Sequence, residues 1–388
     1  MRCKNNNKKK SALAALTASA LSLPALQVNA SSQPVDNTIS YRYSSYMEDD
    51  AKASDVATGS TDRYDIDIQQ FKIIAPVGRN YSVSFDSIFE TMSGASPMGT
   101  QAGSDGQPQL VMSGASISED RDDITVGLTH YGETMATGLS VGRSTENDYE
   151  ATYYGVDWEW EFNQKNSAIQ VAYSHSDDDI TPTDAVLFGR IQSASKDTDS
   201  INLGFSQIID KLSLIQFGIG FSKDNGYLSD PYKINDVRPS DRSRFTAITR
   251  YRHFFKNSNA ALHLDYRYYS DDWDVTSHTL KAAWHKNVTS KVQLIPSLRY
   301  YSQTEANFYE PFKVSGNTNP FFSSDYRLSP YGAISAGLQI IHSFNNFSYT
   351  AKIERYEADK SFSLEKVAVE NPGLVSYTLF TVGFDINF

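Results

Sequence analysis

The sequence predicts an all-β protein, a transmembrane antiparallel up-and-down β-barrel of about sixteen strands. Three observations predict this fold. Alternating segments of roughly ten residues, the length of a tilted membrane-spanning strand, recur from Ile39 to the end of the chain. Short turns alternate with long loops between these segments. The beginning of the chain has the features of a secretory signal peptide.

Residues 1–30 are expected to be a signal peptide, with residues 31–388 forming the barrel. Basic residues come first, followed by an apolar stretch from Ala12 to Leu26 and by the small-residue sequence Val28-Asn29-Ala30. This stretch is too short to span a membrane as a helix. The only cysteine, Cys3, precedes it, so disulfides, thiol catalysis and cysteine-ligated metals are not expected after cleavage.

The composition is acidic and rich in aromatic residues. Without the predicted signal the chain keeps 30 basic and 46 acidic residues, a net charge of −16. A nucleic-acid partner is therefore not expected, because such partners require a basic surface. The chain has 24 tyrosines and 13% aromatic residues, which suits a barrel with aromatic girdles at the membrane interfaces.

The connections between the predicted strands are of two kinds. Seven are short and rich in turn-forming residues: Pro76–Asn80, Tyr131–Thr134, Asn163–Asn166, Asp210–Lys211, Lys256–Asn259, Asn287–Ser290 and Asn345–Asn346. Eight others alternate with them, near residues 48–62, 92–120, 145–149, 177–197, 224–243, 270–274, 304–328 and 358–374. This order predicts sixteen strands, or 14 or 18 if one hairpin is misjudged, with short periplasmic turns and long extracellular loops.

The last predicted strand ends the sequence on an aromatic residue. Phe384, Ile386 and Phe388 share one face of this strand. A closed barrel pairs the last strand with the first, and the terminal aromatic resembles the C-terminal signal that barrel assembly machinery reads. Outer-membrane lipid and this machinery are therefore expected partners. Pro296, inside another predicted strand, removes a ladder hydrogen bond and predicts a bulge.

Charged residues at positions expected to face the lumen separate by sign. The acidic arc comes from early strands and comprises Asp65, Asp67, Asp157, Glu159 and Glu161. The basic arc comes from later strands and comprises Arg250, Arg252, Arg267, Lys281, Arg299 and Lys352. Two readings stay open: a transverse field across a water-filled pore, which favours small polar solutes, or ion pairs that hold a packed lumen together.

Chemistry-bearing motifs are scarce. The seven histidines show no HExxH spacing and the sequence has no GxSxG elbow. Acidic stretches such as Met47–Asp50 and Ser118–Asp123 are better explained as solvated loop ends than as calcium sites, because none has the pattern of an EF-hand. No enzymatic activity, cofactor or metal is therefore predicted.

Several stretches are more specific than barrel physics requires. They are Met92–Pro97 with Met112–Ser116, Gly226–Lys233 with Asn235–Pro239, Tyr266–Tyr269 with Ser277–Leu280, Pro296–Gln303 and Ser323–Ser329. From about Ile39 to Phe388 the chain resembles domain of unknown function 3570 (DUF3570), a family of predicted outer-membrane barrels. The resemblance implies the fold and an outer-membrane location in a Gram-negative bacterium, but no catalytic residues. Family members are often encoded beside a small lipoprotein, a thioredoxin-like protein and a flavin-attaching enzyme, which implies an envelope redox role.

Four charged residues of these motifs lie in predicted loops: Asp230, Asp236, Arg238 and Asp325. Structural ion pairs within inward-folded loops are favoured over a ligand site, because charges removed from water are usually paired. For the whole protein, a passive channel for small polar solutes is the leading hypothesis. The alternatives are a non-conducting barrel that docks an envelope redox partner, a surface receptor or adhesin, and, less favoured, a lipid-active enzyme.

Overall fold

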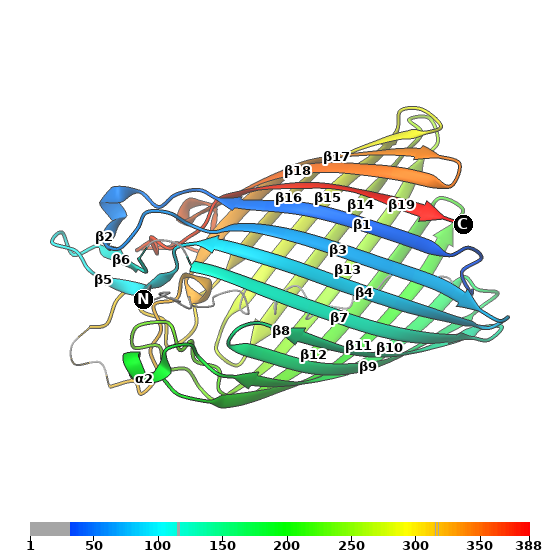
Figure 1. The fold of residues 1–388 in the computed structure, drawn as a ribbon. Helices are drawn as coiled ribbons and strands as arrows, with labels where there is room; N and C mark the ends of the chain where they lie inside the picture. The colour runs from blue at the N-terminus through cyan, green and yellow to red at the C-terminus, as the bar shows by residue number, and fades with distance from the viewer. Residues whose placement is uncertain (1–31, 115–116, 315, 317) are drawn as a thin grey trace, which may run out of the picture.

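A computed structural model describes residues 32–114, 117–314, 316 and 318–388. Sixteen antiparallel strands form one closed barrel in the ring order β1-β19-β18-β17-β16-β15-β14-β13-β12-β11-β10-β9-β8-β7-β4-β3 (Figure 1). The ring closes between β1 and β19, where Thr38 lies opposite Asn387. The predicted sixteen-stranded up-and-down barrel is confirmed. The predicted signal peptide, residues 1–30, lies outside the described residues.

The barrel strands follow the alternating segments of the sequence. Their bounds are β1 (Thr38–Glu48), β3 (Asp65–Val77), β4 (Tyr81–Gly94), β7 (Ile117–Tyr131), β8 (Met135–Thr145), β9 (Tyr149–Phe162), β10 (Ser167–Ile180), β11 (Ala194–Asp210), β12 (Ser213–Gly226), β13 (Asp241–Phe255), β14 (Ala260–Asp271), β15 (Thr276–Asn287), β16 (Val292–Gln303), β17 (Tyr331–Phe344), β18 (Phe347–Asp359) and β19 (Tyr377–Asn387). Each of the seven predicted short connections joins two of these strands.

The seven predicted short turns lie at one end of the barrel, the turn end, and the other connections, most of them long, lie at the opposite end, the loop end (Figure 1). The long connections contain a three-stranded sheet of β2 (Val56–Thr58), β6 (Pro108–Met112) and β5 (Pro97–Ala102). They also hold helix α2 (Ala185–Phe188) and the 3-10 turns η1 (Ala53–Asp55), η2 (Tyr326–Leu328) and η3 (Lys360–Phe362). Among the described residues, no helix is both long and apolar enough to cross a membrane.

The strand register assigns every side chain to the lumenal or the outer face, because direct cross-strand partners share a face. The outer face carries large apolar side chains that remain exposed, such as Leu139, 56% exposed, and Leu298, 63% exposed. Such a contiguous apolar surface is what a barrel presents to lipid. Toward the turn end, Trp160 packs between Trp158 and Phe162 on this face, as expected for an aromatic girdle.

Two sequence-based expectations about the strands are wrong. Asp65 and Asp67 lie opposite Met47 and Ser45 of β1, on the outer face rather than in the lumen. The register between β15 and β16 is the same on both sides of Pro296, since Ala283 pairs with Ser297 and Lys286 with Leu294. No bulge is therefore needed. The pairing of β15 with β16 keeps its register on both sides of Pro296, and Pro296 itself pairs with Leu338 of β17.

Candidate functional site

The basic arc lies on the lumenal face of strands β13–β16 and β18. One row of cross-strand partners runs from Arg250 to Asp265, then to Lys281 and on to Arg299. The next row toward the loop end contains Arg267, and the next toward the turn end contains Arg252. Lys352 lies further around the ring on β18, opposite Gln339 of β17. The up-and-down topology thus brings residues that are far apart in the sequence onto neighbouring strands.

Only part of the basic arc is neutralised by carboxylates. Arg252 Nη1 lies 2.5 Å from Asp265 Oδ1, and Lys352 Nζ lies 2.6 Å from Glu354 Oε2. Within the part of the chain that the structure describes, Arg267, Lys281 and Arg299 make no ion pair. The guanidinium carbons of Arg267 and Arg299 instead lie 5.8 Å and 5.3 Å from the ring centres of Tyr269 and Tyr301. These three cations therefore face the lumen with uncompensated charge.

The acidic arc is reduced to three of its five predicted members, all on β9. Glu161 pairs with Lys165 at 3.0 Å, and Glu159 accepts a hydrogen bond from Gln170. Asp157 is exposed to the lumen beside Gly138, where a Cβ atom would lie 2.3 Å from its Oδ1. Strand β9 and strand β16, which carries Arg299, stand on nearly opposite sides of the ring.

Sequence reasoning missed a further charged group on β7. The stretch Ser118–Asp123, interpreted as a loop, belongs to this strand. Its buried Arg121 Nη1 lies 2.9 Å from Glu90 Oε2 of β4, and its Nη2 lies 3.3 Å from Asp123 Oδ2. The alternation of Arg121 and Asp123 on one face was the available signal. Glu146 Oε1 lies 3.9 Å from the same guanidinium, so three carboxylates surround Arg121 and this group leaves no cation free for a solute.

Two lumenal histidines that are distant in the sequence are in contact in the folded barrel. His263 of β14 and His285 of β15 lie on neighbouring strands with their ring centres 3.8 Å apart. Their separation in the sequence hides this contact, because it arises from strand pairing. Among the described residues, no cluster of three or more His, Cys, Asp or Glu is arranged to hold a metal ion.

The four predicted loop residues come together in one ion-pair cluster at the loop end. Arg238 lies 2.8 Å from Asp236 and 2.9 Å from Asp325. Arg327, which was not predicted, bonds both Asp325, with its Nε 2.9 Å from Oδ2, and Asp230, at 3.2 Å. Burial alone would raise the pKa of Asp325, but the charges of Arg327, Lys233 and Arg238 hold it well below its usual range. The favoured reading of structural ion pairs fits this geometry.

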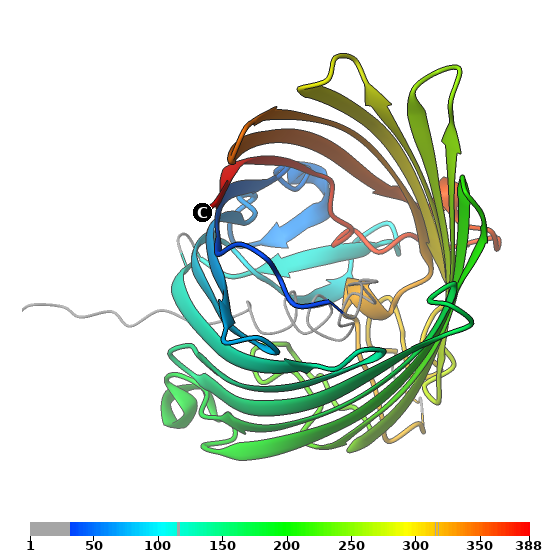
Figure 2. The same cartoon turned by 90° about the vertical axis from the view of Figure 1, so that its right-hand side faces the viewer.

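This cluster is part of a packed assembly of long connections, here called the loop cap: the β1–β3, β4–β7, β12–β13, β16–β17 and β18–β19 connections. Within it, the Ile234 amide donates to Met98 at 2.7 Å and Asn371 donates to Tyr309 at 3.0 Å. Trp273, in the short β14–β15 connection, packs against Phe308 of the cap. Seen along the barrel from the turn end, these segments lie across the far opening (Figure 2).

The barrel is similar to several solved structures. It aligns with CdiB from Acinetobacter baumannii at a TM-score of 0.50 and 7% identity, over 91% of this chain and 60% of that one. It aligns with OccK2 (OpdF) from Pseudomonas aeruginosa, crystallised with glucuronate, at a TM-score of 0.44 and 9% identity, over 91% and 98%. A bacterial polysaccharide outer membrane secretin gives 0.49 and 9% identity, over 90% and 98%. At such identities the likeness concerns the fold alone.

No curated protein matches the sequence. A family model does match, and it covers residues 13–370, which is most of the chain. Its description, a protein of unknown function, assigns no activity to the lumenal wall or the loop cap. The fold and this match together show that the chain is an outer-membrane β-barrel of the DUF3570 family.

Proposed function

We propose that this barrel is a passive channel for small polar solutes across the outer membrane of a Gram-negative bacterium. The observation that carries the proposal is the unpaired charge on the lumenal wall: Arg267, Lys281 and Arg299 on one side, and Asp157 on β9 across from them. Charges in a dry, packed lumen would be paired, because desolvation of an isolated ion is costly. Uncompensated charges of this kind are best explained by water in the lumen.

The two arcs give this channel a mechanism of selection. Cations on β14–β16 face a carboxylate on β9, so the field runs across the pore rather than along it. A polar solute aligns its dipole with such a field as it passes, whereas an apolar solute loses hydration and gains nothing. The proposed solutes are therefore small, polar and charged or zwitterionic.

A second candidate is a non-conducting barrel that docks a periplasmic envelope protein, of the small lipoprotein or thioredoxin-like kind. One observation favours it: the loop cap lies across the loop end and is held by the buried Asp325 cluster (Figure 2). A cap stabilised by paired charges closes a barrel, as plugs do in other outer-membrane proteins. The turn end then remains as the accessible docking side.

Single-channel recording separates the two candidates. The refolded mature protein is placed in a planar bilayer with a salt gradient, which reports both conductance and ion preference. The channel proposal expects stepwise openings, with a shift toward cations in the variant R267Q/K281Q/R299Q because three lumenal cations are lost. Openings with an unchanged ion preference would overturn the role of the basic arc. A folded but silent barrel that cross-links to a periplasmic partner would favour docking.

A further inference from the structure

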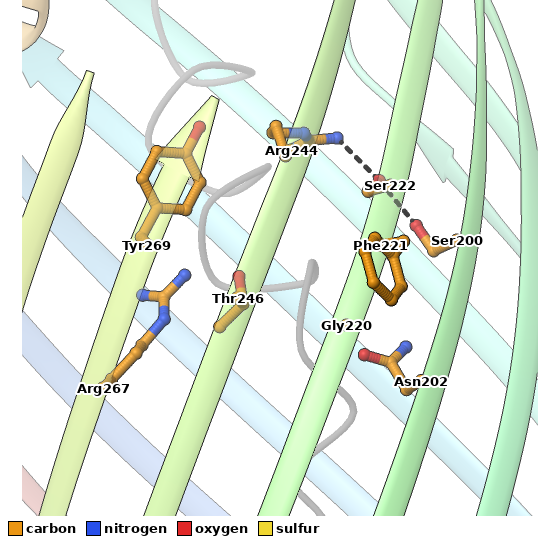
Figure 3. A pocket seen from close by; sticks show the side chains of 9 residues that line it. All are labelled: Ser200, Asn202, Gly220, Phe221, Ser222, Arg244, Thr246, Arg267 and Tyr269. Carbon is orange, nitrogen blue, oxygen red and sulfur yellow. Dashed lines mark hydrogen bonds between the residues drawn. The ribbon is translucent and has the colours of Figure 1, made fainter. Parts of the chain in front are cut away.

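A recess opens in the lumenal wall where β11, β12, β13 and β14 lie side by side (Figure 3). Six of the residues that line it are Asn202, Gly220, Ser222, Arg244, Thr246 and Arg267. The register joins Asn202 to Gly220, Gly220 to Thr246, and Ser222 to Arg244. All of them share the lumenal face with Arg250, which lies an even number of residues from Arg244 and Thr246 on β13.

Gly220 allows the Asn202 side chain to lie in the recess. A Cβ atom at this position would lie 2.6 Å from Asn202 Oδ1, closer than van der Waals contact allows. The Asn202 amide therefore lies over the backbone of Gly220, and the register places Asn202 and Thr246 on the two strands that flank β12. Figure 3 shows Thr246 between Arg267 and Gly220, with Asn202 on the other side of Gly220.

The recess has more positive charge than its own carboxylates neutralise. Arg244 Nη2 lies 2.5 Å from Asp224 Oδ1 and 3.0 Å from Ser222 Oγ. Arg267 has no such partner, and its buried Nε lacks a hydrogen bond within the described part of the chain. Two guanidinium groups thus face one carboxylate, which leaves one positive charge uncompensated.

Neutral hydrogen-bonding groups complete the recess. The Asn202 amide and the Thr246 hydroxyl make no side-chain hydrogen bond among the residues that the structure describes. By contrast, Ser200 and Ser222 bond each other at 2.7 Å, and the Tyr269 hydroxyl donates to Asp271 at 2.7 Å. The unused donors are therefore those of Arg267, Asn202 and Thr246, all of which line the recess.

We infer that this recess is a binding subsite for the carboxylate group of a small polar solute. A guanidinium donates two parallel hydrogen bonds to a carboxylate. Neighbouring amide and hydroxyl donors can bond the remaining lone pairs of the carboxylate oxygens. A planar carboxylate fits the guanidinium of Arg267 and supplies the negative charge that this residue lacks among the described residues. The inference deepens the proposed channel function and rests on it, because a solute reaches this wall only through a water-filled lumen.

Gluconate tests the subsite, with uncharged sorbitol as its size-matched control and inorganic phosphate as the competing anion. Binding to the full-length refolded barrel is measured by calorimetry in detergent, and block of single-channel current is measured in parallel. Wild type is expected to bind gluconate and not sorbitol. R267Q is expected to weaken gluconate binding by about tenfold or more, the loss that follows removal of a hydrogen-bonded charge.

Three further variants sharpen the test. K211Q removes the same charge from an exposed turn and is expected to bind gluconate as wild type does. R267K keeps the positive charge but cannot donate two parallel hydrogen bonds to a carboxylate, so it is expected to bind gluconate more weakly than wild type. G220V keeps every cation but places a side chain where the Asn202 amide lies, so gluconate binding is expected to be lost. The different gel mobility of folded and boiled barrels verifies folding of each variant.

Gluconate binding and single-channel current test the subsite and the channel separately. Openings without gluconate binding would overturn the subsite and leave the channel standing. A silent barrel that binds gluconate through Arg267 would overturn the channel and support the subsite. Equal binding of phosphate, or equal loss in K211Q and R267Q, would overturn the carboxylate assignment, because the effect would then be one of general charge.

Discussion

The loop cap and the lumenal wall treat charge in opposite ways. In the cap, Asp325 is only 2% exposed and is surrounded by Arg238 and Arg327, so each ion of this cluster has a counter-ion. On the wall, Arg267, Lys281 and Arg299 lack carboxylate partners within the described residues. Buried charges need partners because they have lost water, whereas lumenal charges in water do not. Pairing therefore distinguishes charges that hold the structure from charges available to a solute.

The largest expected effect follows from D325N. Loss of this carboxylate leaves the partly buried Arg238 and Arg327 with only Asp236 and Asp230 as partners, which is expected to destabilise the loop cap by about 1–3 kcal/mol. Limited proteolysis of the loops in the folded barrel measures the effect. D49N is the matched control, since Asp49 and Arg355 form an exposed pair with side chains 52% and 38% exposed. Its expected cost is below about 1 kcal/mol, and an equal effect of both variants would contradict the comparison.

Lumenal charge should control ion preference without affecting stability. The variant R267Q/K281Q/R299Q is expected to move the reversal potential in a salt gradient toward cation preference, because the acidic arc then dominates the field. Its thermal unfolding should stay close to that of wild type, since no ion pair is broken. A marked loss of stability would mean that these side chains pack a closed lumen.

The cap should also resist acid. The folded-state pKa of Asp325 is depressed, so its contribution to stability is complete above the unfolded value of about 4 and is lost as pH falls through the depressed value. Loop protection in wild type should therefore persist from pH 7 to about pH 4 and decline below it. Hydrogen exchange of the loops across this range measures the decline. In D325N this acid-dependent step should be absent.

The smallest expected effect comes from D67N, on the outer face. Tyr43 donates a hydrogen bond to Asp67 at 2.7 Å there, away from the lumen. Ion preference should not change in D67N. D157N is the matched lumenal variant and is expected to shift preference toward anions, because the acidic arc then loses its exposed member. Equal shifts in the two variants would contradict the assignment of faces.

The error at Asp65 and Asp67 has a physical cause. Beside these aspartates, Ile66 is 6% exposed and packs inside the barrel with Tyr64 and Met92. At the loop end Ile66 packs inward against Tyr64 of the β1–β3 connection, so the apolar residue faces the interior and the aspartates face outward. Nearer the turn end of the same strand, Phe71 and Ile73 lie on the outer face, the same face as the two aspartates. In the sequence, the apolar positions change from even numbers up to Ile68 to odd numbers from Phe71. This change indicated that the apolar face is not the same along the whole strand.

The sequence by itself determined the barrel. Period-two alternation, strand length and turn residues are local properties, so they specified sixteen strands, seven turns and the lumenal position of Arg250 to Lys352. Tertiary structure alone decided which charges are paired. The cluster around Asp325, the contact of His263 with His285 and the recess at Gly220 join side chains from different strands or loops. Such contacts depend on register and loop packing, which local patterns do not encode.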